Sequence, residues 1–174
     1  MIPIRINNLV QTRIIKELSF HDDMTGLLNR RAYEEELNTI REHKDMDDLV
    51  IVAMDVNGLK KINDTIGHEC GDELIIGAAS CMKKCFDKYG KVFRTGGDEF
   101  CAILRIKESQ LTELQYEFQK VVSTFESTHI KNLSISCGYV VKEKDNNMSI
   151  HDMIVLADKR MYADKKNYYN NNQQ

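Results

Sequence analysis

The chain has 174 residues and a formal net charge of −3, and 42% of its residues are hydrophobic and 29% charged. These proportions are ordinary for one globular domain that buries its own core without disulfides. A small negative charge without a basic patch argues against a nucleic acid or an anionic membrane as partner.

The cysteines and the hydropathy pattern predict a cytoplasmic protein, or the cytoplasmic part of a larger membrane-anchored protein. The five cysteines are odd in number and form no CxxC pair, so we expect free thiols in a reducing environment. No apolar stretch approaches the length of a membrane span, and the amino terminus lacks a signal-peptide pattern. We therefore expect no membrane contact within this segment.

The amino-terminal segment, residues 1–19, carries apolar side chains at helical spacing from about residue 4. A helix of this length is too short to fold alone. Two interpretations stay open. The segment packs on its own domain, or it is the end of a coiled-coil stalk that leads from a sensor domain upstream.

The residues that follow predict alternating helices and strands. Residues 49–54 are six consecutive apolar residues, which is typical of a strand buried on both faces. Ser149 and Asp152 form a capping-box-like pair ahead of the last helix, and the Asn/Gln-rich residues 167–174 predict a frayed polar tail. The other expected helices are at about 30–42, 72–86 and 111–125, and the other expected strands at 91–93, 100–104 and 133–137, the last with serines alternating with apolar residues.

The run RTGGDEF, from Arg94 to Phe100, joins two of the expected strands. Its two glycines reach the positive φ values that tight hairpin turns demand. Asp98 and Glu99 then lie at the tip of a hairpin, beside a backbone that a polyphosphate and a metal ion can approach. A hairpin with a solvated acidic turn is the alternative interpretation.

Asp55 directly follows the buried strand at 49–54. A strand fixes the position of such a carboxylate, while the loop after it leaves the carboxylate accessible. Neighbouring central strands would bring Asp55 close to Asp98. Oxygen ligands of this kind suit Mg²⁺, which takes one or two carboxylates together with substrate phosphates.

Five spaced motifs resemble those of the GGDEF family of diguanylate cyclases, in a consistent order from about residue 20 to 166. They are DMTGLLNRR at 23–31, DVNGLKKIN at 55–63, GH at 67–68 with GD at 71–72, RTGGDEF at 94–100 and ADKRMY at 157–162. The element order fits an α+β fold, a ferredoxin-like palm of order βααββαβ with helices flanking a central antiparallel sheet. The resemblance implies that residues 20–166 are a nucleotidyltransferase domain, which condenses two GTP into cyclic di-GMP plus pyrophosphate at the interface of a homodimer.

The resemblance also implies a metal set and a catalytic set. By position, the metal ligands are Asp55, the Val56 carbonyl and Asp98, with Glu99 as a further ligand, and the ion is Mg²⁺ or Mn²⁺. Asp98 also takes the position of the family's proton acceptor. Lys60 would meet the negative charge that develops on the phosphates; without the motif it would be interpreted as a solvated loop lysine.

Two residues are expected to read the base. Asn63 and Asp72 occupy the family's positions, and a carboxylate can accept hydrogen bonds from the N1–H and the exocyclic amino group of guanine. His68 falls in the substrate loop. Outside this motif, Asp72 would be interpreted as a helix N-cap and His68 as a turn residue that forms local hydrogen bonds.

The backbone amides of Gly58 and Leu59 would cradle the terminal phosphates, and Lys165 matches the family's lysine after the last helix motif. The chain departs from the family at Tyr169, which stands where an arginine is expected. Tyrosine offers one neutral hydrogen bond and arginine a charged fork. We therefore expect a weaker hold on GTP.

The entry turn at 23–31 is interpreted as structural. Asp23, Asn29 and Arg30 are expected to order it through Asx-type hydrogen bonds. Arg94, just before the hairpin turn, is expected to pair with a nearby carboxylate.

Three other functions compete with the cyclase. A non-catalytic GTP-binding module on the same fold stays open, although the intact acidic set of Asp55, Asp98 and Glu99 favours the enzyme. A palm polymerase or single-substrate cyclase is disfavoured, because the chain offers neither fingers and thumb domains nor a basic template groove. A P-loop GTPase is disfavoured because there is no GxxxxGK[ST] motif.

Overall fold

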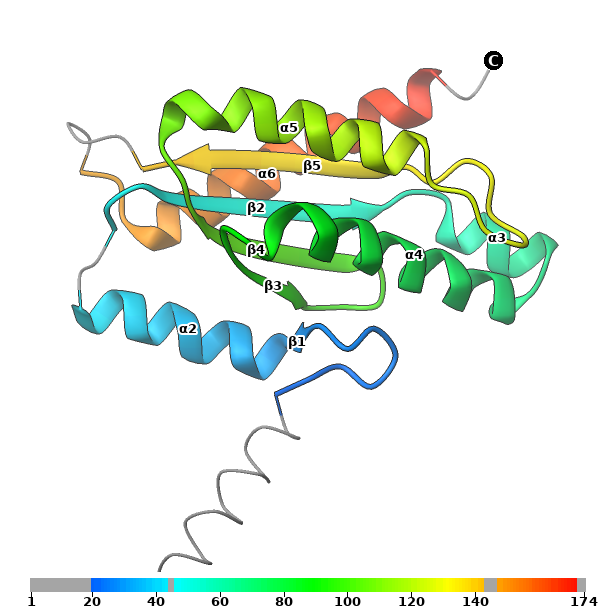
Figure 1. Cartoon of the computed structure of the whole chain (residues 1–174), viewed down its shortest axis with the longest axis horizontal. Coiled ribbons are helices and arrows are strands. Elements are labelled where there is room, and N and C mark those ends of the chain that lie inside the picture. Colours follow the sequence, from blue (N-terminus) through cyan, green and yellow to red (C-terminus); the bar gives the residue numbers. More distant parts are fainter. Residues whose placement is uncertain (1–19, 44–45, 143–146, 172–174) are drawn as a thin grey trace, which may run out of the picture.

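The computed structural model describes residues 20–43, 46–142 and 147–171 (Figure 1). The predicted helix or stalk at 1–19 and residues 172–174 lie outside the described residues. The elements are β1 (Leu28–Asn29), α2 (Arg30–His43), β2 (Leu49–Val56), α3 (Leu59–Thr65), α4 (His68–Phe86), β3 (Gly90–Arg94), β4 (Glu99–Arg105), α5 (Glu108–Ser123), β5 (Ile135–Val141) and α6 (Ile150–Asn171).

The strands form one five-stranded sheet of order β1-β3-β4-β2-β5. The β3–β4, β4–β2 and β2–β5 neighbours are antiparallel, and from β2 to β5 the element order is the predicted βααββαβ. The predicted α+β fold is therefore confirmed. The short strand β1 was not predicted; it pairs parallel with β3 through only two residues, too few to show an alternating pattern.

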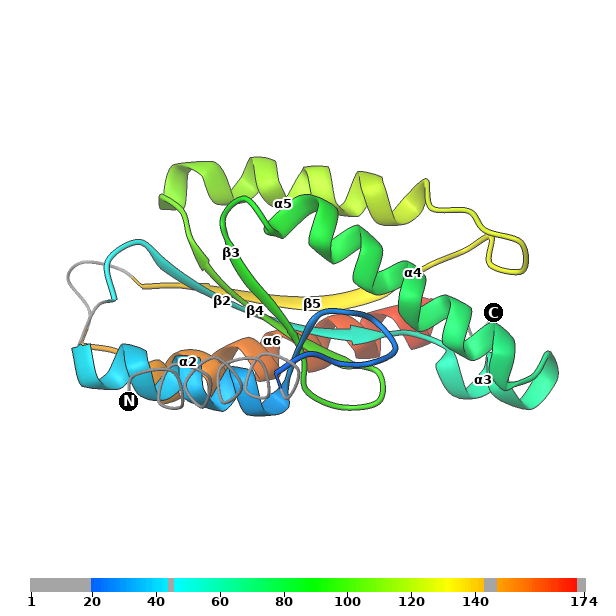
Figure 2. The same cartoon turned by 60° about the horizontal axis from the view of Figure 1, so that its bottom comes forward.

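Helices cover both faces of the sheet, with α4 and α5 on one face and α2 and α6 on the other (Figure 2). Every residue of β2 is buried, because alternate side chains enter the two cores. Val50, Val52 and Met54 pack under α4 and α5. Leu49, Ile51 and Ala53 pack under α2 and α6. The unbroken apolar run of this strand reflects its position between the two helical layers.

Helix α6 approaches the sheet most closely at Gly138 of β5. A Cβ atom at this position would collide with the backbone of Ala157, so only glycine allows the contact. Two side chains of α6 also bind the outer edge of β5: Asp164 Oδ2 accepts the Cys137 amide hydrogen at 2.9 Å, and Arg160 donates to the Tyr139 carbonyl. These contacts fix α6 along β5, and its last turns reach the end of β2.

The helix ends confirm one prediction and correct two others. The capping box is confirmed, since Ser149 Oγ accepts the Asp152 amide hydrogen at 3.2 Å and Asp152 Oδ2 accepts the Ser149 amide hydrogen at 3.1 Å. Helix α4 begins at His68, so Asp72 lies inside the helix and the N-cap interpretation is wrong. Helix α6 continues to Asn171, so residues 167–171 of the predicted polar tail are helical.

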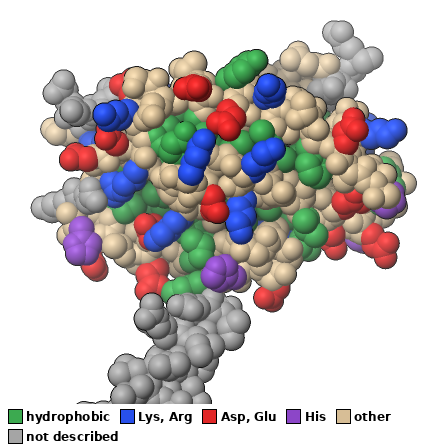
Figure 3. Space-filling view, in the orientation of Figure 1, with side chains coloured by type: hydrophobic (Ala, Val, Ile, Leu, Met, Phe, Trp, Pro, Cys, Tyr) green, Lys and Arg blue, Asp and Glu red, His purple; other side chains and the backbone are tan. Residues whose placement is uncertain are grey.

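Lys and Arg side chains are interspersed with Asp and Glu on the face shown in Figure 3. Among the described helices, none combines the length and the apolar character that crossing a bilayer requires.

Candidate active site

The end of β2 and the β3–β4 hairpin lie side by side at one edge of the sheet. Asp55 is the register partner of Glu99, and the Val56 amide hydrogen is donated to the Asp98 carbonyl at 3.0 Å. The two acidic motifs, more than forty positions apart in sequence, are therefore brought together by the antiparallel pairing of β2 with β4.

Arg94 fastens the hairpin tip to the entry turn. Its guanidinium donates to the Gly97 carbonyl at 2.9 Å and to Asp22 Oδ1 at 3.0 Å. Asp22 is thus the expected carboxylate partner of Arg94. Its carboxylate also accepts the Thr25 amide hydrogen at 2.9 Å. Burial opposes ionisation of Asp22, but the hydrogen bonds from Thr25 and Arg94 outweigh it and lower its pKa.

The prediction for the entry turn was therefore half right. Asn29 caps α2, with its Oδ1 accepting the Ala32 amide hydrogen at 3.1 Å. The Asx-type turn, however, is made by Asp22 instead of Asp23, since Asp22 Oδ1 accepts the Thr25 amide hydrogen. Arg30 forms an exposed ion pair with Glu34 at 3.2 Å.

Asp55 is a buried carboxylate, 4% exposed, in an acidic neighbourhood. Burial raises its pKa, and the negative charges of Asp98 and Glu99 raise it further. The Lys165 ammonium, 2.7 Å from Asp55 Oδ1, acts in the opposite direction without cancelling the increase. This corner of the molecule therefore has more negative than positive charge, which a bound cation would relieve.

The side chains alone do not complete a metal site. Within the described ranges, no group of three or more His, Cys, Asp or Glu side chains is arranged to hold a metal ion. Two carboxylates with a backbone carbonyl, completed by phosphate oxygens, would suit Mg²⁺, which retains ligands from substrate and water. The oxygen chemistry and the excess negative charge around Asp55 fit such an ion.

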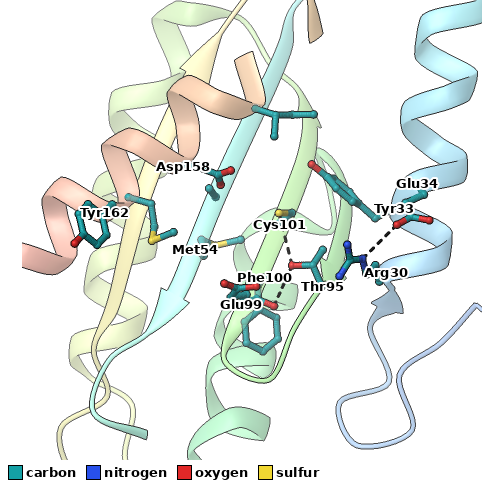
Figure 4. A pocket seen from close by; sticks show the side chains of 13 residues that line it. Arg30, Tyr33, Glu34, Met54, Thr95, Glu99, Phe100, Cys101, Asp158 and Tyr162 are labelled. Atoms are coloured by element: carbon teal, nitrogen blue, oxygen red, sulfur yellow. Dashed lines mark hydrogen bonds and ion pairs between the residues drawn. The ribbon is translucent and has the colours of Figure 1, made fainter. Parts of the chain in front are cut away.

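Glu99 extends toward a separate cavity of about 460 Å³ between α2, α6 and the hairpin (Figure 4). Asp158 and Tyr162 of α6 line it opposite Tyr33 of α2. Burial raises the pKa of Asp158, and the negative charge of Glu99 adds to the increase. Glu99 is thus placed beside both the Asp55 corner and this cavity.

The turn between β2 and α3 is anchored by a buried polar network. Asn57 is 4% exposed, and its Nδ2 donates to Ser134 Oγ at 3.0 Å and to Ser136 Oγ at 2.9 Å. Its Oδ1 accepts from Ser136 Oγ at 3.1 Å, and its amide hydrogen is donated to the Ser134 carbonyl at 3.0 Å. Gly58 follows with a φ of 79°, a conformation that L side chains rarely adopt. The turn is therefore held in one shape.

The last turns of α6 form the opposite wall of the site. Besides the ion pair of Lys165 with Asp55, the hydroxyl of Tyr169 accepts the Gly58 amide hydrogen at 3.4 Å. A cavity of about 580 Å³ lies beside this contact, lined by Gly58, Lys60 and Tyr169 among others. The structure thus brings the residue that departs from the family pattern directly to the loop expected to cradle phosphates.

The expected base-reading residues lie on the neighbouring helices α3 and α4. Asn63 Oδ1 is buried and has no hydrogen-bond partner among the described residues. A Cβ atom at Gly71 would collide with this oxygen, so Gly71 provides the space that Asn63 needs. Asp72 follows on α4 with an exposed side chain, and His68 is exposed at the first turn of that helix. A buried acceptor without a hydrogen-bond partner is costly.

The family model for the diguanylate cyclase GGDEF domain matches residues 19–171. The chain belongs to this family. This GGDEF domain shares 35% identity over 153 residues with the probable diguanylate cyclase DgcJ of Escherichia coli, which covers 84% of the chain and 29% of DgcJ. It shares 26% identity over 168 residues with the diguanylate cyclase DgcS of Shewanella oneidensis, covering 94% of the chain and 56% of DgcS.

Solved structures agree on the fold. The GGDEF domain superposes with a TM-score of 0.78 on the coiled coil and GGDEF domain of DgcB from Caulobacter crescentus, crystallised with c-di-GMP, at 24% identity and with 94% of this chain and 90% of that one covered. The isolated GGDEF domain of DgcB superposes with a TM-score of 0.74 at 26% identity, with 86% of this chain and 89% of that one covered. The first relatives are longer proteins, of which this chain spans about a third or less.

Sequence reasoning missed the network around Asn57. The alternation in residues 133–137 predicts an apolar face at 135 and 137, and both residues pack against the core. Ser136, on the opposite face, is also buried and contacts Asn57. The available signal was an asparagine two residues after Asp55 and two serines, Ser136 in the partner strand β5 and Ser134 just before it. Only the β2–β5 register shows that they meet.

Proposed function

We propose that this GGDEF domain is a diguanylate cyclase, which condenses two GTP molecules into cyclic di-GMP in a Mg²⁺-dependent reaction at the interface of a domain dimer. Each 3′-hydroxyl oxygen attacks the α-phosphorus of the other GTP. Two new phosphodiester bonds form, two α–β phosphoanhydride bonds break, and two pyrophosphates leave. The protein has little covalent chemistry to perform, so positioning and charge neutralisation dominate.

One observation carries this proposal: the buried carboxylate of Asp55 lies at the end of β2 beside the acidic hairpin that bears Asp98. Asp55, the Val56 carbonyl and Asp98, with Glu99 as a further ligand, would hold Mg²⁺, with Mn²⁺ as an alternative. The ion would neutralise charge on the phosphates and on the leaving pyrophosphate.

The chain's own residues would divide the remaining work between them. The amides of Gly58 and Leu59 would bind the terminal phosphates, and Lys165 would move from Asp55 to a phosphate oxygen. Lys60, the second residue of α3, would stabilise the negative charge that develops during transfer. Asp98 would accept the proton of the attacking 3′-hydroxyl.

The base would lie at the start of α4. Asp72 would accept hydrogen bonds from the N1–H and the exocyclic amino group of guanine. Asn63 supports this placement, because its buried Oδ1 needs a donor. His68, on the first turn of α4, would complete the pocket.

A domain that holds one GTP makes half of a symmetric product, so the active form would be a homodimer. Residues 1–19 would connect the domain to a partner helix or to a sensor domain upstream, within a protein that acts in the cytoplasm. The longer relatives support the idea of further domains.

The decisive experiment is incubation of the purified protein with GTP and Mg²⁺, followed by chromatographic separation of the nucleotides. Cyclic di-GMP with release of pyrophosphate is the expected result, and ATP should give no corresponding product. Binding of GTP without any product would instead identify a non-catalytic GTP-binding module. An EDTA-treated sample serves as the metal control.

A further inference from the structure

The end of α6 contacts two polar groups at the β2–α3 turn, the carboxylate of Asp55 and the backbone amide of Gly58. Lys165 and Tyr169 are four residues apart and therefore lie on the same face of the helix. Lys165 Nζ is 2.7 Å from the Asp55 carboxylate, and the Tyr169 hydroxyl lies 3.4 Å from the Gly58 amide nitrogen. The groups proposed to bind metal and phosphate are thus already engaged by the protein itself.

The two contacts differ in what a nucleotide would do to them. Lys165 carries a charge that can pass from a carboxylate to a phosphate oxygen, so it keeps a partner when substrate binds. The phenol oxygen of Tyr169 is an acceptor, as is the phosphate oxygen that would bind the same amide hydrogen. The two acceptors therefore compete for the same amide hydrogen. The bond to the charged phosphate is favoured, because a charge-assisted hydrogen bond is about twice as strong as a neutral one.

We propose that Tyr169 is an affinity-determining residue whose hydroxyl competes with the terminal phosphates of the nucleotide for the Gly58 amide. This inference rests on the proposed phosphate-binding role of the β2–α3 turn. The hydroxyl satisfies the amide while the site is empty, and the phosphate must displace it. Tyr169 therefore weakens triphosphate binding.

The surroundings of Tyr169 allow this displacement. Tyr169 is 40% exposed, and the cavity of about 580 Å³ beside it gives the ring space to move. The Gly58 backbone, in contrast, follows Asn57, which is fixed by four hydrogen bonds. The moving partner is thus the tyrosine, and the amide stays in place to receive the phosphate.

The test is the affinity of wild type and Tyr169→Phe for the α,β-methylene analogue of GTP with Mg²⁺, measured by calorimetry. This analogue cannot undergo transfer, so turnover does not enter the measurement. Phenylalanine keeps the ring and removes only the competing oxygen. We expect the dissociation constant to fall about two- to tenfold, the range of one neutral hydrogen bond.

Two controls make the result specific. GMP lacks the terminal phosphates, so its affinity should not change. Tyr162→Phe removes another hydroxyl from α6, at a ring that lies against the Lys166 ammonium and outside the β2–α3 turn, and it should leave analogue binding unchanged.

Weaker or unchanged analogue binding by Tyr169→Phe would overturn the proposal, and weaker binding would mean that the hydroxyl donates to the phosphate. An equal gain for GMP would also overturn it, because the effect would then not involve the terminal phosphates. A wild-type protein that binds the analogue but makes no cyclic di-GMP would refute the cyclase proposal alone. If neither protein binds the analogue, both proposals fall.

Discussion

The two walls of the candidate active site are held in different ways. On one wall, the β2–α3 turn is fixed through Asn57, which is buried and makes four hydrogen bonds to Ser134 and Ser136. On the other, the end of α6 makes one ion pair through Lys165 and one long hydrogen bond through Tyr169. The side chain of Lys165 is 27% exposed and Tyr169 is 40% exposed.

This difference separates groups with a fixed position from side chains that can change partners. The fixed wall carries the groups whose location defines the site, namely the Asp55 carboxylate, the Val56 carbonyl and the Gly58 amide. The α6 wall carries side chains that can exchange one partner for another. Changes in the fixed wall should therefore affect turnover or folding, whereas changes in the α6 wall should affect mainly the KM for GTP.

The largest effect is expected from Asp55→Asn or Asp98→Asn, each of which removes one carboxylate proposed to hold the metal ion. Cyclic di-GMP formation should fall by a factor on the order of 10²–10³ or more, with the melting temperature retained. Initial rates at saturating GTP and Mg²⁺ measure the loss, and the exposed Asp87→Asn serves as the charge-matched control. Undiminished product from either variant would contradict the metal assignment.

Asn57→Ala should reduce the free energy of unfolding by about 1–3 kcal/mol, because it leaves Ser134 and Ser136 with unpaired hydrogen-bonding groups. Urea denaturation measures this change, with the exposed Asn132→Ala as control. Equal stability of the two variants would show that the turn is not held by this network, and the distinction between the walls would fail.

Lys165→Ala removes the cation of the α6 wall. The KM for GTP should rise about ten- to a hundredfold, the range of one charge-assisted hydrogen bond, with a smaller change in kcat. Steady-state kinetics measure both constants, and Lys159→Ala, an exposed lysine of the same helix, controls for the lost charge. A fall in kcat with an unchanged KM would assign Lys165 to the transition state instead.

Tyr169→Arg should give the smallest effect, a decrease in the KM for GTP of about threefold to tenfold. Arginine removes the competing hydroxyl and adds a charged donor near the phosphates. Asn170→Arg adds the same charge to the next residue and should change the KM less. Equal effects of the two variants would show that only long-range charge matters at this end of α6.

The fixed wall also shows where sequence reasoning succeeds and where it stops. The strand before Asp55 and the hairpin bearing Asp98 were predictable, because an unbroken apolar run and two apolar runs joined through Gly-Gly are local patterns. The conformation expected of the turn was wrong, since neither Gly96 nor Gly97 has a positive φ. The Asn57 network was not, because its members lie 77 and 79 positions apart and meet only through the strand register.

The prediction for the end of α6 was wrong for another reason. Its polar composition predicts a frayed tail, but the helix continues to Asn171, and Lys165 and Tyr169 contact the β2–α3 turn from one of its faces. Tertiary contacts here override a weak local preference. The same contacts place Tyr169 at Gly58. The family pattern alone indicated only that Tyr169 stands at the position of an expected arginine.

The binding of the β5 edge by α6 has a consequence for how two copies can meet. An edge strand offers unpaired amide and carbonyl groups that can template strand addition or aggregation. On β5, Asp164 already accepts the Cys137 amide hydrogen and Arg160 already donates to the Tyr139 carbonyl. A second chain cannot extend the sheet here without breaking both bonds. Strand addition between two copies of this domain is therefore disfavoured at the β5 edge.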